Sequence, residues 1–435
     1  MRIKERTYRA CFVLCILGLM LSGFAPGLIA QDHWVATWAA SPQAASFGFA
    51  RPPQSSSPPT AEPKQATQSK QPSPFMLPPD INNQTVRMIV RTSVGGRSMR
   101  VHLSNAYGTG PLTIGAARIA LRDKDSSIVP DSDRALTFSG KASFVIPPGA
   151  LAVSDPVDFA VPKLGYLAIS VYITGDPTPP TVHLTGLHTT YISKAGDFTK
   201  EKSIADATTT QSWYYLSSVD VLAPANAGSI VAFGDSITDG ATSTPDTDRS
   251  WPSQLAERLQ ANPATASMAI VNHGISGNRL LADGAGVSAL ARFDRDVIAQ
   301  PGVKYLIVLE GINDIGMSSM MPAAGTALTA DDLIAAHKQM IERAHLHGIK
   351  AFGATLLPYG GAMYFSEKGE ALRQSVNQWI RTSGAYDGVI DFDAKLRDPA
   401  NPKEMNAAYF INDHLHPNDA GYKLMAEAVE LSLLK

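Results

Sequence analysis

The spacing of apolar and polar residues changes character about halfway along the chain. Between residues 83 and 222, short runs rich in Val, Ile, Thr and aromatic residues are separated by clusters of Gly, Pro and Asp. Several runs alternate apolar with polar side chains, which is typical of strands that cover a core on one face. Strands are therefore predicted at 85–92, 98–103, 112–121, 166–173 and 213–222. Many short strands separated by turns predict a β-sandwich similar to a jelly roll.

After residue 226 the pattern becomes that of an α/β protein, with short apolar runs alternating with longer amphipathic stretches. Strands are predicted at 229–233, 270–272, 305–310, 350–356 and 389–392, and helices at 251–260, 287–299, 330–346 and 367–382. A last helix is predicted over 417–434, because Pro417 suits a first helical turn. This alternation predicts a parallel sheet covered on both faces, whose functional sites gather at the carboxyl ends of its strands.

The first thirty residues predict a targeting segment. Basic residues from Arg2 to Arg9 precede an apolar stretch over residues 10–24, and the segment ends at Ala30. This layout is typical of a cleavable signal peptide over residues 1–30, which would direct the protein to the periplasm or the medium. A membrane anchor is the alternative, although the apolar stretch is short for a span of about 20 residues. A β-rich domain is then expected over 31–225 and an α/β domain over 226–435.

Composition narrows the classes of function. The net charge is -2 and no basic stripe is visible, which argues against nucleic-acid binding, and no later segment is apolar enough for an integral membrane protein. Both cysteines, Cys11 and Cys15, lie in the targeting segment, so the mature protein would have no disulfide and no thiolate nucleophile. Residues 41–80, dense in Pro, Ser and Gln, predict an irregular segment. No pattern sets an oligomeric state.

Ser236 is a candidate nucleophile. It follows the predicted strand 229–233 within Gly234-Asp235-Ser236, so it would lie at the edge of the sheet where strands end. A serine hydroxyl is a poor nucleophile unless a base removes its proton. Taken alone, this short motif also fits an ordinary turn before a helix.

His416 is the candidate base, immediately before the predicted last helix. Asp413, three residues earlier, can fold back on a turn and hold the imidazole through Nδ1, which leaves Nε2 to face Ser236. Two alternatives remain open. The first is a helix-entry turn capped by Asp413. The second is a metal site made of Asp413, His414 and His416.

Candidate hydrogen-bond donors follow two other predicted strands. An ester attacked by serine develops a negative oxygen, which preorganised donors must stabilise. The backbone N–H groups of Ser236 and Gly277 and the side-chain amide of Asn313 would form such an oxyanion hole. Asp235 and Asp314 adjoin these positions, and we expect them to brace the loops and not to react.

Together, the fragments resemble the SGNH hydrolases, also called the GDSL esterase family. The blocks of that family correspond to Ser236, Gly277, Asn313 and His416, with Asp413 in the usual Asp-x-x-His spacing. The resemblance covers roughly residues 228–435 and implies a flavodoxin-like three-layer fold that uses no metal and no organic cofactor. The sequence Trp-Ala-Ala-Ser-Pro over residues 38–42 also resembles, more loosely, exported two-domain members with a β-rich domain before the hydrolase.

The sequence thus predicts an exported carboxylic ester hydrolase that works through an acyl-enzyme. The expected substrates are short acyl esters, chiefly acetyl esters, of carbohydrates or small alcohols. Lipase or arylesterase specificity fits the same residues. The rival hypothesis is a non-catalytic carbohydrate-binding protein with a relic hydrolase domain. The β-rich domain motivates that rival, and the complete set of serine, histidine, acid and donors argues against it.

Overall fold

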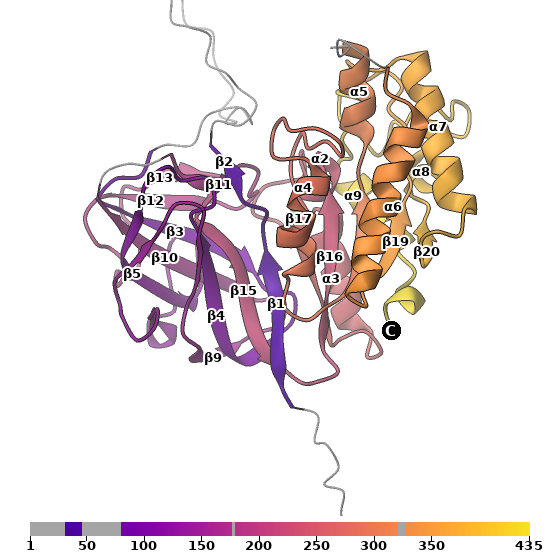
Figure 1. Cartoon of the computed structure of the whole chain (residues 1–435). Coiled ribbons are helices and arrows are strands. Elements are labelled where there is room, and N and C mark those ends of the chain that lie inside the picture. The colour runs from indigo at the N-terminus through magenta and orange to yellow at the C-terminus, as the bar shows by residue number, and fades with distance from the viewer. Residues whose placement is uncertain (1–30, 46–79, 176–178, 321–326) are drawn as a thin grey trace, which may run out of the picture.

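The computed structural model describes residues 31–45, 80–175, 179–320 and 327–435. The expected signal peptide lies outside the described residues, as does most of the expected irregular segment 41–80. The described residues form an N-terminal β-rich part and a C-terminal α/β part, which lie side by side in Figure 1. The architecture changes between Ala223, the last residue of β15, and Gly228, the first residue of β16.

The N-terminal part is an antiparallel sandwich. In one sheet the strand order is β1-β15-β4-β8 and β9 also pairs with β4; in the other the order is β13-β12-β3-β10-β5-β6 and β7 pairs with β5. Apolar side chains from both sheets, such as Val90 of β3 and Val101 of β4, meet in one core. The strands of these sheets are β1 (His33–Ala39), β3 (Gln84–Arg91), β4 (Gly96–Ser104), β5 (Leu112–Leu121), β6 (Arg134–Leu136), β7 (Phe144–Ile146), β8 (Leu151–Val153), β9 (Val157–Val161), β10 (Tyr166–Thr174), β12 (Thr190–Ala195), β13 (Thr208–Thr210) and β15 (Leu216–Ala223).

A small third sheet has the strand order β14-β11-β2. Its strands are β2 (Gln43–Ala44), β11 (Thr181–His183) and β14 (Trp213–Tyr214). The strand predicted over 213–222 is therefore wrong as one element. Tyr215 adopts a positive φ of 59° between β14 and β15, a conformation that interrupts a regular strand.

The C-terminal part is built on a parallel sheet with the order β17-β16-β18-β19-β20. Its strands are β16 (Gly228–Gly234), β17 (Met268–Gly274), β18 (Val303–Leu309), β19 (Lys350–Ala354) and β20 (Gly388–Ile390). The first strand along the chain lies between the second and the third, which is the flavodoxin-like order 2-1-3-4-5. The predicted fold class is confirmed. In such sheets ligands bind at the carboxyl ends of the strands beside this switch in order.

Helices cover both faces of the parallel sheet (Figure 1). Figure 1 shows α4 and α6 in front of the strands and α3 and α9 behind them. The helices are α2 (Ser236–Asp239), α3 (Trp251–Ala261), α4 (Ala289–Phe293), α5 (Ile312–Met320), α6 (Ala330–Leu346), α7 (Glu367–Thr382), α8 (Phe392–Leu396) and α9 (Asp419–Ala428), with 3-10 turns at Pro130–Ser132 and Leu431–Leu434 and a π-helical turn at Asp294–Ile298.

Two predicted helices differ from the structure. The helix predicted over 417–434 begins at Asp419, because the side chain of Asn418 caps it by accepting the N–H groups of Ala420 and Gly421. It ends at Ala428, where the extended backbone of Val429 follows. The stretch predicted as one helix over 287–299 begins at Ala289 and continues after Phe293 as the π-helical turn.

Strand β1 joins the two parts of the molecule. Its residues alternate between the two cores, since Val35 packs in the sandwich core and Ala36 packs in the α/β core. The backbone N–H of Ala36 also donates to the carbonyl of Pro301 at 3.0 Å. Ser93 adds a second link, because its Oγ accepts the N–H of Ile270 on β17 at 2.9 Å. The β-rich part therefore packs directly on the parallel sheet of the C-terminal part.

Candidate active site

Ser236 lies at the carboxyl end of β16, where the chain enters the short helix α2. The side chain of Asp235 caps this helix by accepting the N–H of Ile237 at 2.9 Å. Gly234 is required just before it, because an added Cβ would lie 2.6 Å from the carbonyl oxygen of Leu309. Gly240, with a φ of 100°, ends the helix. The sharp strand-to-helix turn thus holds the Ser236 hydroxyl above the sheet.

His416 contacts Ser236 from a distant part of the chain. Its Nε2 lies 2.8 Å from Oγ of Ser236, and its Nδ1 lies 2.6 Å from Oδ2 of Asp413. The other carboxylate oxygen of Asp413 accepts the backbone N–H groups of Leu415 and His416, each at 3.0 Å. Partial burial opposes the charge on Asp413, but the hydrogen bonds from His416 hold the pKa of this carboxyl below its ordinary value. Such a row of groups can pass a proton from the hydroxyl to the imidazole.

The candidate donors follow the two strands that flank β16. Gly277 comes after β17 and has a φ of 78°, which a residue with a side chain rarely adopts. Asn313 lies in the first turn of α5, directly after β18. Its Nδ2 donates one hydrogen to the carbonyl of Asn278 at 2.9 Å, and its Oδ1 accepts the hydroxyl of Tyr364 at 3.3 Å. These bonds fix the plane of the amide and leave its second N–H available for an oxyanion.

Asp235 and Asp314 are buried and bind backbone N–H groups. The two oxygens of Asp314 accept the N–H groups of Leu280 and Leu281 at 2.6 and 2.9 Å. Burial raises the pKa of both carboxyls above the ordinary value, because the charged form loses its hydration. Their contacts are those of residues that hold loops in place.

Arg292, which no sequence motif indicates, is completely buried beneath the candidate site. Its guanidinium carbon lies 4.0 Å from the centre of the Phe233 ring. Its guanidinium donates to the carbonyl oxygens of Gly234 (2.9 Å) and His273 (2.8 Å), Oδ1 of Asn278 (2.8 Å), Oδ2 of Asp296 (3.0 Å), Oγ of Ser41 (3.1 Å) and Oε1 of Glu310 (3.4 Å). One side chain thus joins β16, β17 and the residues after β18. The sequence offers no signal for this role beyond a cation within a helical pattern.

Asp239, at the end of α2, is not a solvated loop residue. Its side chain is 2% exposed and forms a buried ion pair with His183 of the β-rich part, with 2.9 Å between Oδ1 and Nε2. The pair went unrecognised because its two partners come from different parts of the molecule, which no local pattern can report.

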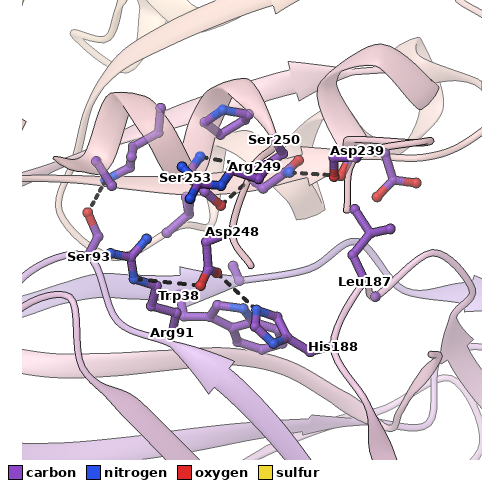
Figure 2. A pocket seen from close by; sticks show the side chains of 18 of the residues that line it. Trp38, Arg91, Ser93, Leu187, His188, Asp239, Asp248, Arg249, Ser250 and Ser253 are labelled. Atoms are coloured by element: carbon purple, nitrogen blue, oxygen red, sulfur yellow. Dashed lines mark hydrogen bonds and ion pairs between the residues drawn. The ribbon is translucent and has the colours of Figure 1, made fainter. Parts of the chain in front are cut away.

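A cavity lies at the boundary between the two parts of the molecule, apart from the candidate site. It is lined by residues of both parts, including Arg91, His188, Asp239 and Asp248, but not by Ser236. Figure 2 shows Asp248 between Arg91 and His188, at 3.8 and 2.9 Å. The candidate site is therefore defined by its hydrogen-bonded side chains and not by the cavity.

The metal-site alternative finds no support in the described part of the chain. There, no three His, Cys, Asp or Glu side chains gather in a way that could hold a metal ion. The ring of His414 packs against Phe410 instead, with 4.6 Å between the ring centres. Within the same described residues, none of the helices has the length and apolar character needed to span a bilayer.

Comparison with known proteins identifies the C-terminal part. Residues 232–424 match the sequence model of the GDSL-like lipase/acylhydrolase family. Similar solved structures include a G-D-S-L family protein from Desulfitobacterium hafniense, with 25% identity, 46% of this chain and 96% of the other covered, and a TM-score of 0.35. They also include an acetylxylan esterase from Geobacillus stearothermophilus, with 22% identity, coverage of 48% and 94%, and a TM-score of 0.37.

A GDSL-like lipase from Bacteroides thetaiotaomicron is similar to the same half of the chain, with 19% identity, coverage of 47% and 87%, and a TM-score of 0.34. No curated protein matches the chain. The family match spans β16 to α9 and so includes the turn at Ser236, the residues after β17 and β18, and the loop of His416. The C-terminal domain of this chain belongs to the GDSL-like lipase/acylhydrolase family, and the protein is a carboxylic ester hydrolase.

Proposed function

We propose that this protein is an exported serine esterase that hydrolyses short acyl esters, chiefly acetyl esters, of carbohydrates or small alcohols. Ser236, His416 and Asp413 are its catalytic residues. The observation that carries the proposal is the continuous hydrogen-bonded row from Asp413 through His416 to Oγ of Ser236. Nucleophile, base and orienting acid stand in that order in serine esterases and proteases of unrelated folds.

In the proposed mechanism, His416 takes the proton of Ser236 while Oγ attacks the ester carbonyl. Asp413 orients the imidazole through Nδ1 and stabilises the imidazolium. The tetrahedral oxyanion accepts hydrogen bonds from the N–H groups of Ser236 and Gly277 and from Nδ2 of Asn313. His416 then gives its proton to the leaving alcohol. Water repeats the sequence on the acyl-enzyme, which releases the acid and restores the Ser236 hydroxyl.

The preference for a short acyl group is supported by the small exposed area of the site. Ser236 and Asn313 are 6% and 7% exposed, so little surface is open around the reacting atoms. A panel of p-nitrophenyl esters with rising acyl length, together with acetylated xylan and acetylated monosaccharides, tests this preference. Turnover that rises with acyl length would instead assign a lipase, and turnover of aryl esters alone would assign an arylesterase.

The catalytic assignment is tested by hydrolysis of p-nitrophenyl acetate. We expect Ser236→Ala to lower kcat by about 10⁴-fold or more, because the nucleophile is lost. A hydrolysis rate equal to that of the unaltered protein would overturn the assignment. Glycan binding without turnover of any ester would favour the non-catalytic carbohydrate-binding alternative.

Export is proposed from residues 1–30, which lie outside the described residues. N-terminal sequencing of the protein from culture medium and from a periplasmic extract tests it. A mature chain that begins near residue 31 in either fraction supports cleavage after Ala30. An uncleaved N-terminus in the membrane fraction would favour the anchor.

A further inference from the structure

The β-rich part reaches the active site through His183, the last residue of β11. Nε2 of His183 lies 2.9 Å from Oδ1 of Asp239, and Nδ1 lies 3.0 Å from the carbonyl oxygen of Ser41. A carboxylate and a carbonyl can only accept hydrogen bonds, so both ring nitrogens must donate and the ring is an imidazolium. Burial opposes this charge, but the Asp239 carboxylate and the hydrogen bonds raise the pKa of His183 above its ordinary value.

Asp239 also binds the loop after β17, through its second carboxylate oxygen. Its Oδ2 accepts both the backbone N–H of Ser276, at 2.8 Å, and the hydroxyl of Ser276, at 2.7 Å. The hydroxyl of Thr185, two residues after His183, donates to Oγ of Ser276 at 3.0 Å. Ser276 directly precedes Gly277, the proposed backbone donor of the oxyanion hole.

The main chain of the same residue also belongs to the helix that carries the nucleophile. Asp239 is the last residue of α2, and Ser236 is the first. The backbone N–H of Asp239 donates to the carbonyl of Asp235 at 2.9 Å, so its main chain is fixed to the turn of the nucleophile. One side chain therefore connects the Ser236 turn with the Ser276–Gly277 peptide. The imidazolium of His183 neutralises the Asp239 carboxylate, which would otherwise be a buried charge without a counter-ion.

We propose that His183 is a positioning residue for the oxyanion hole, which acts through Asp239 to hold Gly277 in register with Ser236. The inference rests on the proposed function, since it concerns the same serine chemistry. In this proposal, the β-rich domain contributes a residue that positions the oxyanion hole. Donors of an oxyanion hole lose effect when they are displaced by even about 1 Å, which can lower the rate by about 100-fold.

His188 offers a matched control for His183. It is also a buried histidine of the β-rich part, and its ring stacks on Trp213 as that of His183 does. It pairs with Asp248 of the hydrolase part, at 2.9 Å from Nε2 to Oδ1 (Figure 2). No hydrogen bond of Asp248 reaches the loop of Gly277 among the described residues. Both histidines thus pair with carboxylates of the hydrolase part, and of the two only His183 is linked to the oxyanion loop.

The experiment compares His183→Ala with His188→Ala in the full mature chain. Hydrolysis of p-nitrophenyl acetate and binding of phenylboronic acid, whose serine adduct places an oxygen in the oxyanion hole, are measured. We expect His183→Ala to lower kcat by about 10- to 100-fold, with KM changed by less than about threefold and phenylboronic acid bound correspondingly more weakly. His188→Ala should keep kcat within about twofold of the unaltered protein. Equal losses of kcat in both variants, or none in a folded His183→Ala, would overturn the inference.

Two further variants keep the outcome decisive. If circular dichroism shows that His183→Ala does not fold, His183→Gln replaces it, because the amide keeps much of the side-chain volume and removes the charge that pairs with Asp239. A loss of kcat of about three- to tenfold at an unchanged melting temperature supports the inference, and an unchanged kcat overturns it. Ser236→Ala separates the two proposals. If Ser236→Ala is active, the proposed function fails, whereas an inactive Ser236→Ala beside a fully active His183→Ala defeats only the positioning role.

Discussion

Nε2 of His416 lies 2.8 Å from Oγ of Ser236, although 180 positions separate the two residues along the chain. The parallel sheet makes this contact possible. Ser236 lies at the carboxyl end of β16, and the loop before α9 places His416 at the same edge of the sheet. Asp413 orients the imidazole of this pair, because its carboxylate binds Nδ1 on the opposite side of the His416 ring. The orientation of the His416 ring by Asp413 leads to the first prediction.

Replacing Asp413 by Asn should lower kcat for p-nitrophenyl acetate by about 10³- to 10⁴-fold. The Asn amide can present N–H to Nδ1 of His416, which favours the tautomer that cannot accept the Ser236 proton. Steady-state kinetics measure the effect. Asp419→Asn, which changes a carboxylate that binds Thr244 on the other side of the loop, is the control and should retain kcat. A loss below about tenfold in Asp413→Asn would contradict the orienting role.

Replacing Asn313 by Ala should lower kcat by about 100- to 1,000-fold with a smaller change in KM. In the proposed mechanism, the lost Nδ2–H group donates a hydrogen bond that matters most when the oxyanion has formed. Tyr364→Phe is a milder variant for comparison, since it removes only the hydroxyl that donates to Oδ1 of Asn313 at 3.3 Å. We expect it to lower kcat by less than about tenfold. If Tyr364→Phe proved as damaging as Asn313→Ala, the amide would not be the donor.

The pairing of His188 with Asp246 and Asp248 predicts a stability that depends on pH. Burial opposes the imidazolium, but the two carboxylates raise the pKa of His188 from 6.5 to about 9. The folded protein thus binds the proton more tightly than the unfolded chain, so this stabilisation is complete below pH 6.5 and is lost as the pH rises through about 9. The difference corresponds to roughly 3 kcal/mol at most.

Chemical denaturation at pH 6 and at pH 9 measures this effect as a difference between two proteins. His188→Gln should be less stable than the unaltered protein at pH 6, and the gap should narrow by about 1–3 kcal/mol at pH 9. Other titrating groups contribute equally to both proteins and cancel in this comparison. A gap that is the same at both pH values would show that the charge of His188 does not stabilise the contact between domains.

Most of the regular elements could be predicted from the sequence, since local rules determine them. Helices α6 and α7 begin and end as predicted, because Thr329 and Ser366 cap their first turns and an amphipathic pattern continues to the last. Strand β5 also has its predicted bounds. The last helix begins two residues after the predicted start at Pro417, because the side chain of Asn418 caps its first turn.

The candidate site was predictable where a residue follows a strand end and not where a contact links distant segments. Ser236, Gly277 and Asn313 lie after β16, β17 and β18, and this order along a parallel sheet follows from pattern alone. The pairing of His183 with Asp239 joins two parts of the molecule. Its partners follow no shared periodicity, and sequence patterns cannot report their approach.

Arg292 gives the last prediction, which concerns stability. It is buried and holds the carboxylates of Asp296 and Glu310 together with the carbonyl oxygens at the ends of β16 and β17. In Arg292→Met the buried Oε1 of Glu310 loses the guanidinium, whereas Asp296 keeps its ion pair with Arg295. Burial already raises the pKa of Glu310 well above its ordinary value.

We expect Arg292→Met to lower the free energy of unfolding by about 3–5 kcal/mol, as measured by urea denaturation. Lys403→Met is the control, because Lys403 and Glu367 form a surface pair with side chains 48% and 73% exposed. Exposed pairs of this kind contribute about 0–1 kcal/mol. If the two variants lost similar amounts of stability, the Arg292 network would be replaceable, and the alignment of β16 with β17 beneath Ser236 would have to depend on sheet pairing alone.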